Sequence, residues 1–158
     1  MTEELLRELK AITPEEQRIL DGSGEIDRDI YMSNEQNVID AKKLLDEGKL
    51  IRVRPHTRFV HFPRHIHNFI EVIYMCTGTT HHVVNGKDVV LNPGELLFLN
   101  QSATQEIYPA GENDIAVNFF ILPEFFEYGL TMISEEENQL RDFIIGCLRN
   151  EKEAPGYL

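Results

Sequence analysis

The middle of this chain, between Leu50 and Ile121, consists of short runs rich in β-branched and aromatic residues, the residue types that favour strands. Turn-forming sequences such as Asn85-Gly86 and Asn92-Pro93-Gly94 separate these runs. No helical pattern intervenes, so we expect antiparallel sheets in a sandwich or a closed barrel rather than parallel βαβ units. The expected strands are LIRVRP, TRFVHF, FIEVIYMCT, THHVVNG, KDVVL, ELLFLN, TQEIYP and DIAVNFFIL.

The section before Lys49 is acidic and has helical patterns. In ITPEEQRIL, Thr13 is placed to cap a helix with Pro14 in its first turn. In SNEQNVIDAKKLLDEG, Ser33 and Gln36 form a capping-box pair, and Gly48 is a natural end for the helix. We therefore expect two helical stretches packed against a mainly β domain.

The sequence after the last strand returns to helical patterns. LPEFFEYGL predicts a short helix, and SEEENQLRDFIIGCLRN predicts a second one that begins with a capping box of Ser134 and Glu137. The apolar stripe of the second helix is expected to pack against the outside of the barrel. The stripe is formed by Leu140, Phe143, Ile144, Cys147 and Leu148.

These patterns predict an α+β, mainly β, protein with four parts. Residues 1–49 form an N-terminal helical segment, and residues 50–122 form the β-barrel. Residues 123–150 form C-terminal helices, and residues 151–158 form a linker or tail.

Charge and cysteine content exclude several classes of protein. The 158 residues hold 27 acids against 15 Lys and Arg, for a net charge of −12, which argues against a surface that grips nucleic acid. No run of 18 apolar residues is present, and the N-terminus is charged rather than secretory, so no membrane association is expected. Cys76 and Cys147 lie far apart and are interpreted as reduced thiols of a cytoplasmic protein.

One stretch departs from the acidic composition. Between Gly48 and Ile70 there is no acid, while the stretch holds five Lys or Arg and four histidines. One interpretation is a solvated strand edge, where basic residues discourage sheet pairing. The other is a cationic rim that attracts an anionic small molecule. The basic residues are Lys49, Arg52, Arg54, Arg58 and Arg64.

The stretch RHIHNFIEVIYMCTG carries the residues that most suggest chemistry. On a strand, alternate residues share a face, so His65, His67 and Glu71 lie on one side if the chain bends near Asn68. Two histidines and a carboxylate are the ligand types of a facial metal triad. The adjacent His81 and His82 must face opposite sides of their strand, and neither requires a role.

These residues resemble the first cupin motif, with His65-x-His67-x-x-x-Glu71 followed by Gly78. The sequence from Gly86 to Glu106 resembles the second motif, but Gln105 stands where the family usually has a further histidine. The resemblance implies a cupin barrel, also called a double-stranded β-helix or jelly roll. It also implies that the motif residues point into a cavity.

From Phe59 to Leu148 the chain resembles more closely the N-terminal effector-binding and dimerisation domain of AraC-family transcription regulators. That resemblance implies that the apolar stripe of the C-terminal helix contacts a second copy of the chain rather than only the barrel, and we favour this dimer (residues 123–150 would then be the dimerisation part). It also implies that the homodimer senses a small molecule and passes the signal to helix-turn-helix motifs, which bind DNA and are absent from this chain. The effector is expected to be a sugar or an organic anion. Its expected ligands are His65, His67, Glu71 and Gln105, with Phe59 and Phe69 as apolar walls.

Three interpretations of the histidine cluster remain open. It is the polar lining of an effector pocket, a filled metal site on His65, His67 and Glu71, or a buried network that only satisfies its own polar groups. We expect no cofactor, although the triad leaves a divalent metal open. The alternative function is a stand-alone metal-dependent cupin enzyme, a dioxygenase or isomerase, and a third is an interaction domain with a filled barrel.

Overall fold

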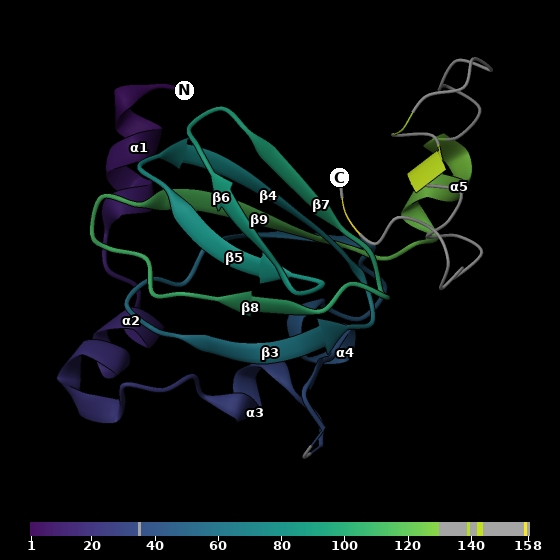
Figure 1. Cartoon of the computed structure of the whole chain (residues 1–158), viewed down its shortest axis with the longest axis horizontal. Coiled ribbons are helices and arrows are strands. Elements are labelled where there is room, and N and C mark those ends of the chain that lie inside the picture. Colours follow the sequence, from purple (N-terminus) through teal and green to yellow (C-terminus); the bar gives the residue numbers. More distant parts are fainter. Residues whose placement is uncertain (35, 130–138, 140–141, 144–156, 158) are drawn as a thin grey trace.

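The computed structural model shows two β-sheets that face each other, with helices at both ends and along one flank (Figure 1). It describes the chain except for residues 35, 130–138, 140–141, 144–156 and 158. The helical elements are α1 (Glu3–Lys10), α2 (Pro14–Arg18), the π-helical turn η1 (Ile19–Ser23), α3 (Arg28–Tyr31), α4 (Ala41–Leu44) and α5 (Phe125–Gly129). The strands are β1 (Val38–Ile39), β2 (Ile51–Pro55), β3 (Phe62–His67), β4 (Ile70–Thr77), β5 (Thr80–Val84), β6 (Lys87–Leu91), β7 (Leu96–Leu99), β8 (Gln105–Ile107) and β9 (Ile115–Ile121).

The chain passes between the two sheets repeatedly. One sheet has the strand order β1-β3-β8-β5-β6, and the other has the order β2-β9-β4-β7. All pairs are antiparallel except β1 with β3. Strands distant in sequence, such as β4 and β9, lie side by side. This is the jelly-roll arrangement of a cupin barrel, so the predicted fold class is confirmed.

The alternation of residues along β4 separates the inside of the barrel from its outside. Glu71, Ile73 and Met75 point inward, while Ile70 and Val72 point to the outer face. The chain bends at Asn68 between β3 and β4, as the alternation of the motif residues required. One half of the interior is filled by Ile73, Met75, Val84, Leu91, Leu97, Leu99, Ala103 and Ala116.

A glycine makes the turn between β4 and β5. Gly78 has a φ of 67°, a left-handed conformation that side chains rarely adopt. A Cβ there would collide with the side chain and backbone of Asp114. Asp114 in turn accepts a hydrogen bond from the Thr79 amide at 2.9 Å. The turn therefore closes tightly over the chain before β9.

The N-terminal segment agrees with the sequence prediction at its first helices and differs from it later. Thr13 caps α2 with Pro14 at its start, and Thr13 and Glu16 form a capping box. The helix predicted to begin at Ser33 is wrong, because Val38–Ile39 forms β1, which pairs with β3. A helix then begins at Ala41, capped by Asp40. The pairing of β1 with the sheet outweighs the helical pattern of the sequence.

The segment TRFVHF is also not a strand along its length. β3 begins only at Phe62, and the residues before it form a loop. In this loop Phe59 has a φ of 69°. The loop carries Arg58, a fully buried cation, into the space between the barrel and the N-terminal helices.

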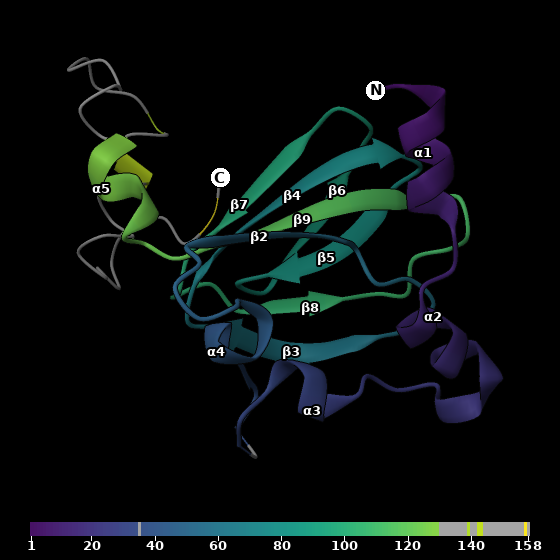
Figure 2. The same cartoon turned by 180° about the vertical axis from the view of Figure 1, so that it is seen from behind.

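The N-terminal helices cover one flank of the barrel. Both views show α3 below β3, α2 beside one end of β3, and α1 at the end of the sheets opposite α5 (Figure 2). A shared apolar cluster joins this segment to the barrel. It contains Ile19, Tyr31, Met32, Ile39, Ala41, Leu44, Leu45, Val60, Phe62, Phe69, Ile107 and Phe120.

The C-terminal section begins with α5, as predicted, and the structure describes only a few residues beyond this helix. Phe143 is 2% exposed and packs against Ile70, Val72 and Ile121 on the outer face of the four-stranded sheet. For this one residue the packing alternative holds. The other stripe positions, Leu140, Ile144, Cys147 and Leu148, lie outside the described residues, as do Ser134 and Glu137. Among the described helices, none is long and apolar enough to cross a membrane.

Candidate functional site

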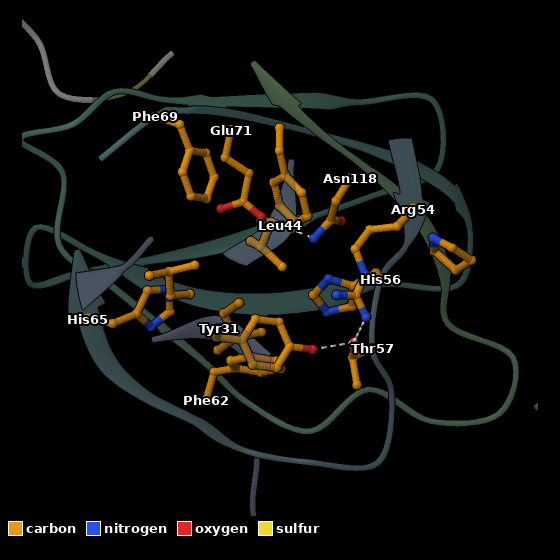
Figure 3. A pocket seen from close by; sticks show the side chains of 14 residues that line it. Tyr31, Leu44, Arg54, His56, Thr57, Phe62, His65, Phe69, Glu71 and Asn118 are labelled. Carbon is orange, nitrogen blue, oxygen red and sulfur yellow. Dashed lines mark hydrogen bonds between the residues drawn. The ribbon is translucent and has the colours of Figure 1, made fainter. Parts of the chain in front are cut away.

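A small cavity lies between the two sheets, in the half of the barrel that the apolar core does not fill (Figure 3). Its volume is about 20 Å³, which is room for about one water molecule. Strands of both sheets line it, and so do residues of the N-terminal segment. The lining residues are Tyr31, Ile39, Leu44, Arg54, Pro55, His56, Thr57, Phe62, His65, Phe69, Glu71, Ile107, Asn118 and Phe120.

Three polar residues form the wall on the side of the four-stranded sheet. Glu71 lies on β4 and Asn118 on β9, and the Asn118 Nδ2 donates to Glu71 Oε1 at 3.0 Å. His56 follows β2 and is 3% exposed. Figure 3 shows all three side chains directed into the space between the sheets. We call them the His56–Glu71–Asn118 wall.

The opposite wall belongs to the five-stranded sheet. His65 on β3 and Gln105 on β8 lie directly across from each other. Gln105 Nε2 donates to His82 Nδ1 at 3.0 Å, and His82 Nε2 donates to Thr80 Oγ1 at 2.8 Å. This chain of hydrogen bonds fixes the tautomer of His82 and the orientation of Gln105.

His65 and His67 are both anchored through Nδ1. His65 Nδ1 donates to the Pro63 carbonyl at 2.8 Å, and His67 Nδ1 donates to the Phe69 carbonyl at 2.6 Å. Each Nε2 therefore carries a lone pair rather than a proton. The His67 ring stacks on Phe69 with centroids 4.8 Å apart, and its Nε2 lies 3.6 Å from Glu71 Oε2.

Burial controls the protonation of the interior. It lowers the pKa of His56 to about 4, an effect that Asn118 partly opposes. Burial also lowers the pKa of His67 and of His82 to about 3. It raises the pKa of Glu71 to about 8, against the opposing positive charge of Arg54. The interior therefore holds neutral imidazoles and a carboxyl group that resists ionisation.

Several interior polar atoms have no hydrogen-bond partner. Within the described part of the chain, the buried side-chain atoms of this kind are both ring nitrogens of His56, His67 Nε2, Gln105 Oε1 and Asn118 Oδ1. All belong to the two walls or to His67 beside them. An unpaired buried polar group costs about 1–3 kcal/mol, so a cluster of five calls for a partner from outside the chain, such as a ligand or a water.

The triad proposed for a metal ion was tested against this geometry. Anchored Nδ1 atoms and free Nε2 lone pairs suit metal ligands, and His67 and Glu71 approach each other. However, no group of three or more His, Cys, Asp or Glu in the described chain is arranged to hold an ion. Glu71 is held by Asn118 through one oxygen. The residues present do not fit a three-ligand metal site, and no reaction step is derived through one.

The predicted ligand residues fall into three groups. His65, Phe69 and Glu71 line the cavity. His67 and Gln105 are buried beside it with one unpaired atom each, although they are not among the lining residues. Phe59 does not reach the cavity; instead Arg58 lies 5.1 Å from the centre of its ring, outside the barrel interior.

Three interior residues were missed from sequence. His82 was given no role, yet it is completely buried and bonded to Gln105. His56 lies in the histidine-rich basic stretch, outside the cupin motif. Asn118 is the one polar residue among the apolar side chains of β9. A lone polar residue at an inward position of an apolar strand was the signal that would have found it.

The interpretation of the basic stretch as a cationic rim is not supported. Arg54 pairs with Glu15 at 2.6 Å, and Arg58 pairs with Glu16 at 2.7 Å. Arg52 donates to the carbonyl of Leu44. Three of the five cations thus hold the N-terminal segment and its connection to the barrel in place.

The same contacts close the cavity. Glu15 accepts hydrogen bonds from Arg54 and from the Tyr31 hydroxyl. Tyr31 is 3% exposed, and its ring packs edge-on against Phe62 at 5.3 Å. Leu44 of α4 lines the cavity and is 1% exposed. Tyr31 and Leu44 thus cover the cavity on the side of the N-terminal segment.

Comparison with known proteins gives one informative match. A family model described as AraC-like ligand binding domain matches residues 47–128, just over half of the chain. A search of curated proteins found no significant match.

Solved cupin structures resemble the chain only distantly. A cupin protein from Bacteroides fragilis is 16% identical, with a TM-score of 0.37 over 46% of this chain and 63% of that one. KdgF from Halomonas sp. is 13% identical, with a TM-score of 0.38 over 49% and 84%. An RmlC-like cupin from Shewanella frigidimarina is 21% identical, with a TM-score of 0.38 over 46% and 66%. Similarity at this level carries no conclusion about function.

Proposed function

Because the chain belongs to the family of AraC-like ligand-binding domains, we propose that it is the small-molecule-sensing part of a transcription regulator. In this proposal an effector binds between the two sheets, against the polar walls described above. The DNA-binding motifs belong to a part of the regulator that is not in this chain. The regulator acts in the cytoplasm, where its DNA is.

The observation that carries this proposal is the cluster of unpaired polar atoms. A barrel that served only as a scaffold would be more stable with apolar residues at these positions. His56, with neither ring nitrogen paired, is the strongest case. Binding sites often retain such locally unfavourable groups because a ligand completes their hydrogen bonds.

Signalling requires two arrangements with different affinity for the effector. The N-terminal segment supplies the element that differs between them, because Tyr31, Ile39 and Leu44 close the cavity. The bound arrangement has this segment displaced from its present position. The change then reaches the rest of the regulator through the dimer contacts or the linker.

We further propose that the chain forms a homodimer through the C-terminal apolar stripe. One amphipathic surface serves both packing on the barrel and contact between subunits. Light scattering at micromolar concentration tests this: a dimer is expected, and a monomer contradicts it. Replacing Leu140 and Leu148 with Lys separates packing on the barrel from contact between subunits. If the two leucines contact the second subunit, the variant should be a folded monomer; if they pack on the barrel, it should instead lose stability.

A thermal-shift screen tests the sensing function. A true ligand stabilises the folded protein by RT ln(1 + [L]/Kd). Sugars, organic acids, alcohols and amines are screened against the wild-type chain and against Asn118→Leu. We expect at least one compound that raises Tm by about 3 °C in the wild type and by less in the variant. Hits that shift both proteins equally contradict a site between the sheets.

The rival function is a metal-dependent cupin enzyme, suggested by the anchored Nδ1 atoms of His65 and His67. Elemental analysis of protein purified without added metal separates the two. Our proposal expects less than one equivalent of iron, manganese, nickel or zinc. One full equivalent that is lost in a His67→Ala variant would favour the enzyme.

A further inference from the structure

We propose that the His56–Glu71–Asn118 wall receives a hydrogen-bond-donating group, a hydroxyl or an ammonium, at the head of an effector whose body is apolar. This inference rests on the sensing function proposed above and specifies the class of effector. The cupin motif supplies only Glu71 of this wall, because His56 and Asn118 lie outside the motif.

The unpaired atoms are mainly acceptors. Asn118 directs its Nδ2 to Glu71 Oε1, which leaves its Oδ1 free to accept. Gln105 directs its Nε2 to His82, which leaves its Oε1 free in the same way. His67 donates through Nδ1 to a carbonyl, so its unpaired Nε2 is an acceptor. A ligand that satisfies these atoms must bring N–H or O–H groups.

His56 adapts to either partner. A neutral imidazole has one N–H and one lone pair, and neither makes a hydrogen bond of good geometry here, although Asn118 lies close enough to raise the pKa of the ring. A hydroxyl can both donate to the lone pair of His56 and accept from its N–H. An ammonium group can donate to the His56 lone pair and to Asn118 Oδ1 together.

An anionic head has no counter-charge in this space. Arg54 is the only cation among the lining residues that the structure describes, and its guanidinium is already paired with Glu15 at 2.6 Å. The wall itself contributes a carboxyl group, Glu71, and the amide oxygen of Asn118. A carboxylate or phosphate would be buried here without a cation to balance it, and the single O–H of a protonated Glu71 does not replace that cation.

The rest of the cavity is apolar. The remaining lining residues are mainly aromatic and aliphatic. Those outside the N-terminal segment stay in place when that segment is displaced, so the body of the ligand loses water there and gains apolar contacts. These residues are Phe62, Phe69, Ile107 and Phe120. A molecule with hydroxyls on all sides would leave most of them facing apolar carbon.

Three probes of one size isolate the head group: benzyl alcohol, benzylamine and benzoate. Each is added at about 10 mM to the wild-type chain, and Tm is measured. The same titration is made on Leu44→Ala, which enlarges the cavity without removing a polar atom. Leu44 belongs to the N-terminal segment whose closed position lowers the apparent affinity for a ligand. Shortening its side chain should therefore give a larger increase in Tm than in the wild type.

We expect the alcohol or the amine to raise Tm by about 3 °C while benzoate has no effect. The shift should disappear in His56→Leu and in Asn118→Leu. It should persist in His81→Gln, because His81 lies on the outer face and pairs with Asp88. In NMR spectra, the ring nitrogen resonances of His56 should move on titration and those of His81 should not.

Three outcomes overturn the inference. The first is a benzoate response equal to or larger than those of the alcohol and the amine. The second is an alcohol or amine response that survives both His56→Leu and Asn118→Leu. The third is that none of the three probes changes Tm in either the wild type or Leu44→Ala. A benzoate response leaves the sensing function intact, and the wider screen judges that function independently of head-group chemistry.

Discussion

Single residues inside the barrel differ in whether their polar atoms have partners. His82 and His56 are both buried histidines whose pKa is lowered by burial. Both ring nitrogens of His82 are bonded, to Gln105 and to Thr80. Neither nitrogen of His56 is bonded. The two rings lie 6.2 Å apart between their centres, so they form a natural matched pair for experiment.

The first prediction compares His56→Leu with His82→Leu in the absence of ligand. His56→Leu removes two unpaired nitrogens and should raise the free energy of unfolding by about 1 kcal/mol. His82→Leu leaves Gln105 and Thr80 without partners and should lower it by about 2 kcal/mol. Urea denaturation measures both. A loss of more than about 1 kcal/mol in His56→Leu would mean that this residue is structural.

The second prediction concerns pH and Glu71. Its folded-state pKa of about 8 lies above the ordinary 4.5, so between these values the folded protein holds a proton that the unfolded chain has released. The contribution of this group is fully present below pH 4.5 and is lost as pH rises through 8. Glu71→Gln removes the dependence. Relative to the variant, the wild type should lose up to about 1.4 kcal/mol per pH unit between about pH 5 and 8.

Urea denaturation at about pH 5.5 and about pH 8 measures this difference. Glu112→Gln, at an exposed position, serves as the control and should follow the wild type. Parallel pH curves for wild type and Glu71→Gln would contradict the assignment of a protonated carboxyl at this position.

The third prediction uses two glycines with similar backbone angles. Gly78 and Gly86 have φ values of 67° and 78°. A Cβ at Gly86 meets no atom within 4 Å, whereas one at Gly78 collides with Asp114. Gly86→Ala should cost about 1 kcal/mol from strain alone, and Gly78→Ala about 3 kcal/mol from strain and overpacking. If urea denaturation shows the same loss of unfolding free energy in both variants, Asp114 moves away from the new Cβ without destabilising the protein.

The N-terminal segment is the element that sequence patterns described least well. Thr13 and Pro14 predicted α2 because a capping box is local. Ser33 and Gln36 gave an equally good local pattern, but Val38 and Ile39 pair with β3 instead. That contact lies far along the chain, and local spacing contains no information about it.

The fourth prediction tests how this element is held. Arg58 and Glu16 are each 2% exposed, and Arg58 also donates to the carbonyls of Lys10, Ala11 and Glu112. Arg58→Met leaves a buried carboxylate unpaired and should cost about 3–5 kcal/mol. The double variant Glu16→Leu/Arg58→Met removes the unpaired carboxylate but also the bonds that Glu16 accepts from the backbone amides of Thr13 and Arg58, so it should recover only part of this loss in urea denaturation.

Arg54→Met is the matched control for that experiment. Its ion pair with Glu15 is more exposed, and Glu15 keeps the Tyr31 hydroxyl as a partner. Arg54→Met should therefore lower the free energy of unfolding by about 1 kcal/mol. If Arg54→Met costs as much as Arg58→Met, the more exposed pair is the main attachment of the segment.

The whole molecule brings together residues that the sequence keeps apart. The alternation of His65, His67, Phe69 and Glu71 predicted one inward face, and the structure confirms it. The cupin motif predicted the barrel and identified Gln105 as a motif position, and the structure places Gln105 across from His65. It could not predict that His56 and Asn118 complete the cavity, because they reach it only after β2, β9 and β4 pair in register. It also could not predict that Arg54 and Arg58 are paired with acids of the N-terminal helices.

The central claim is that the space between the sheets is a small-molecule site, and isothermal titration calorimetry tests it most directly. The strongest compound from the thermal-shift screen is titrated into wild type and into Asn118→Leu. We predict one molecule bound per chain in the wild type and an affinity at least about tenfold lower in the variant, equivalent to about 1.4 kcal/mol. Equal affinity in the two proteins would contradict the account.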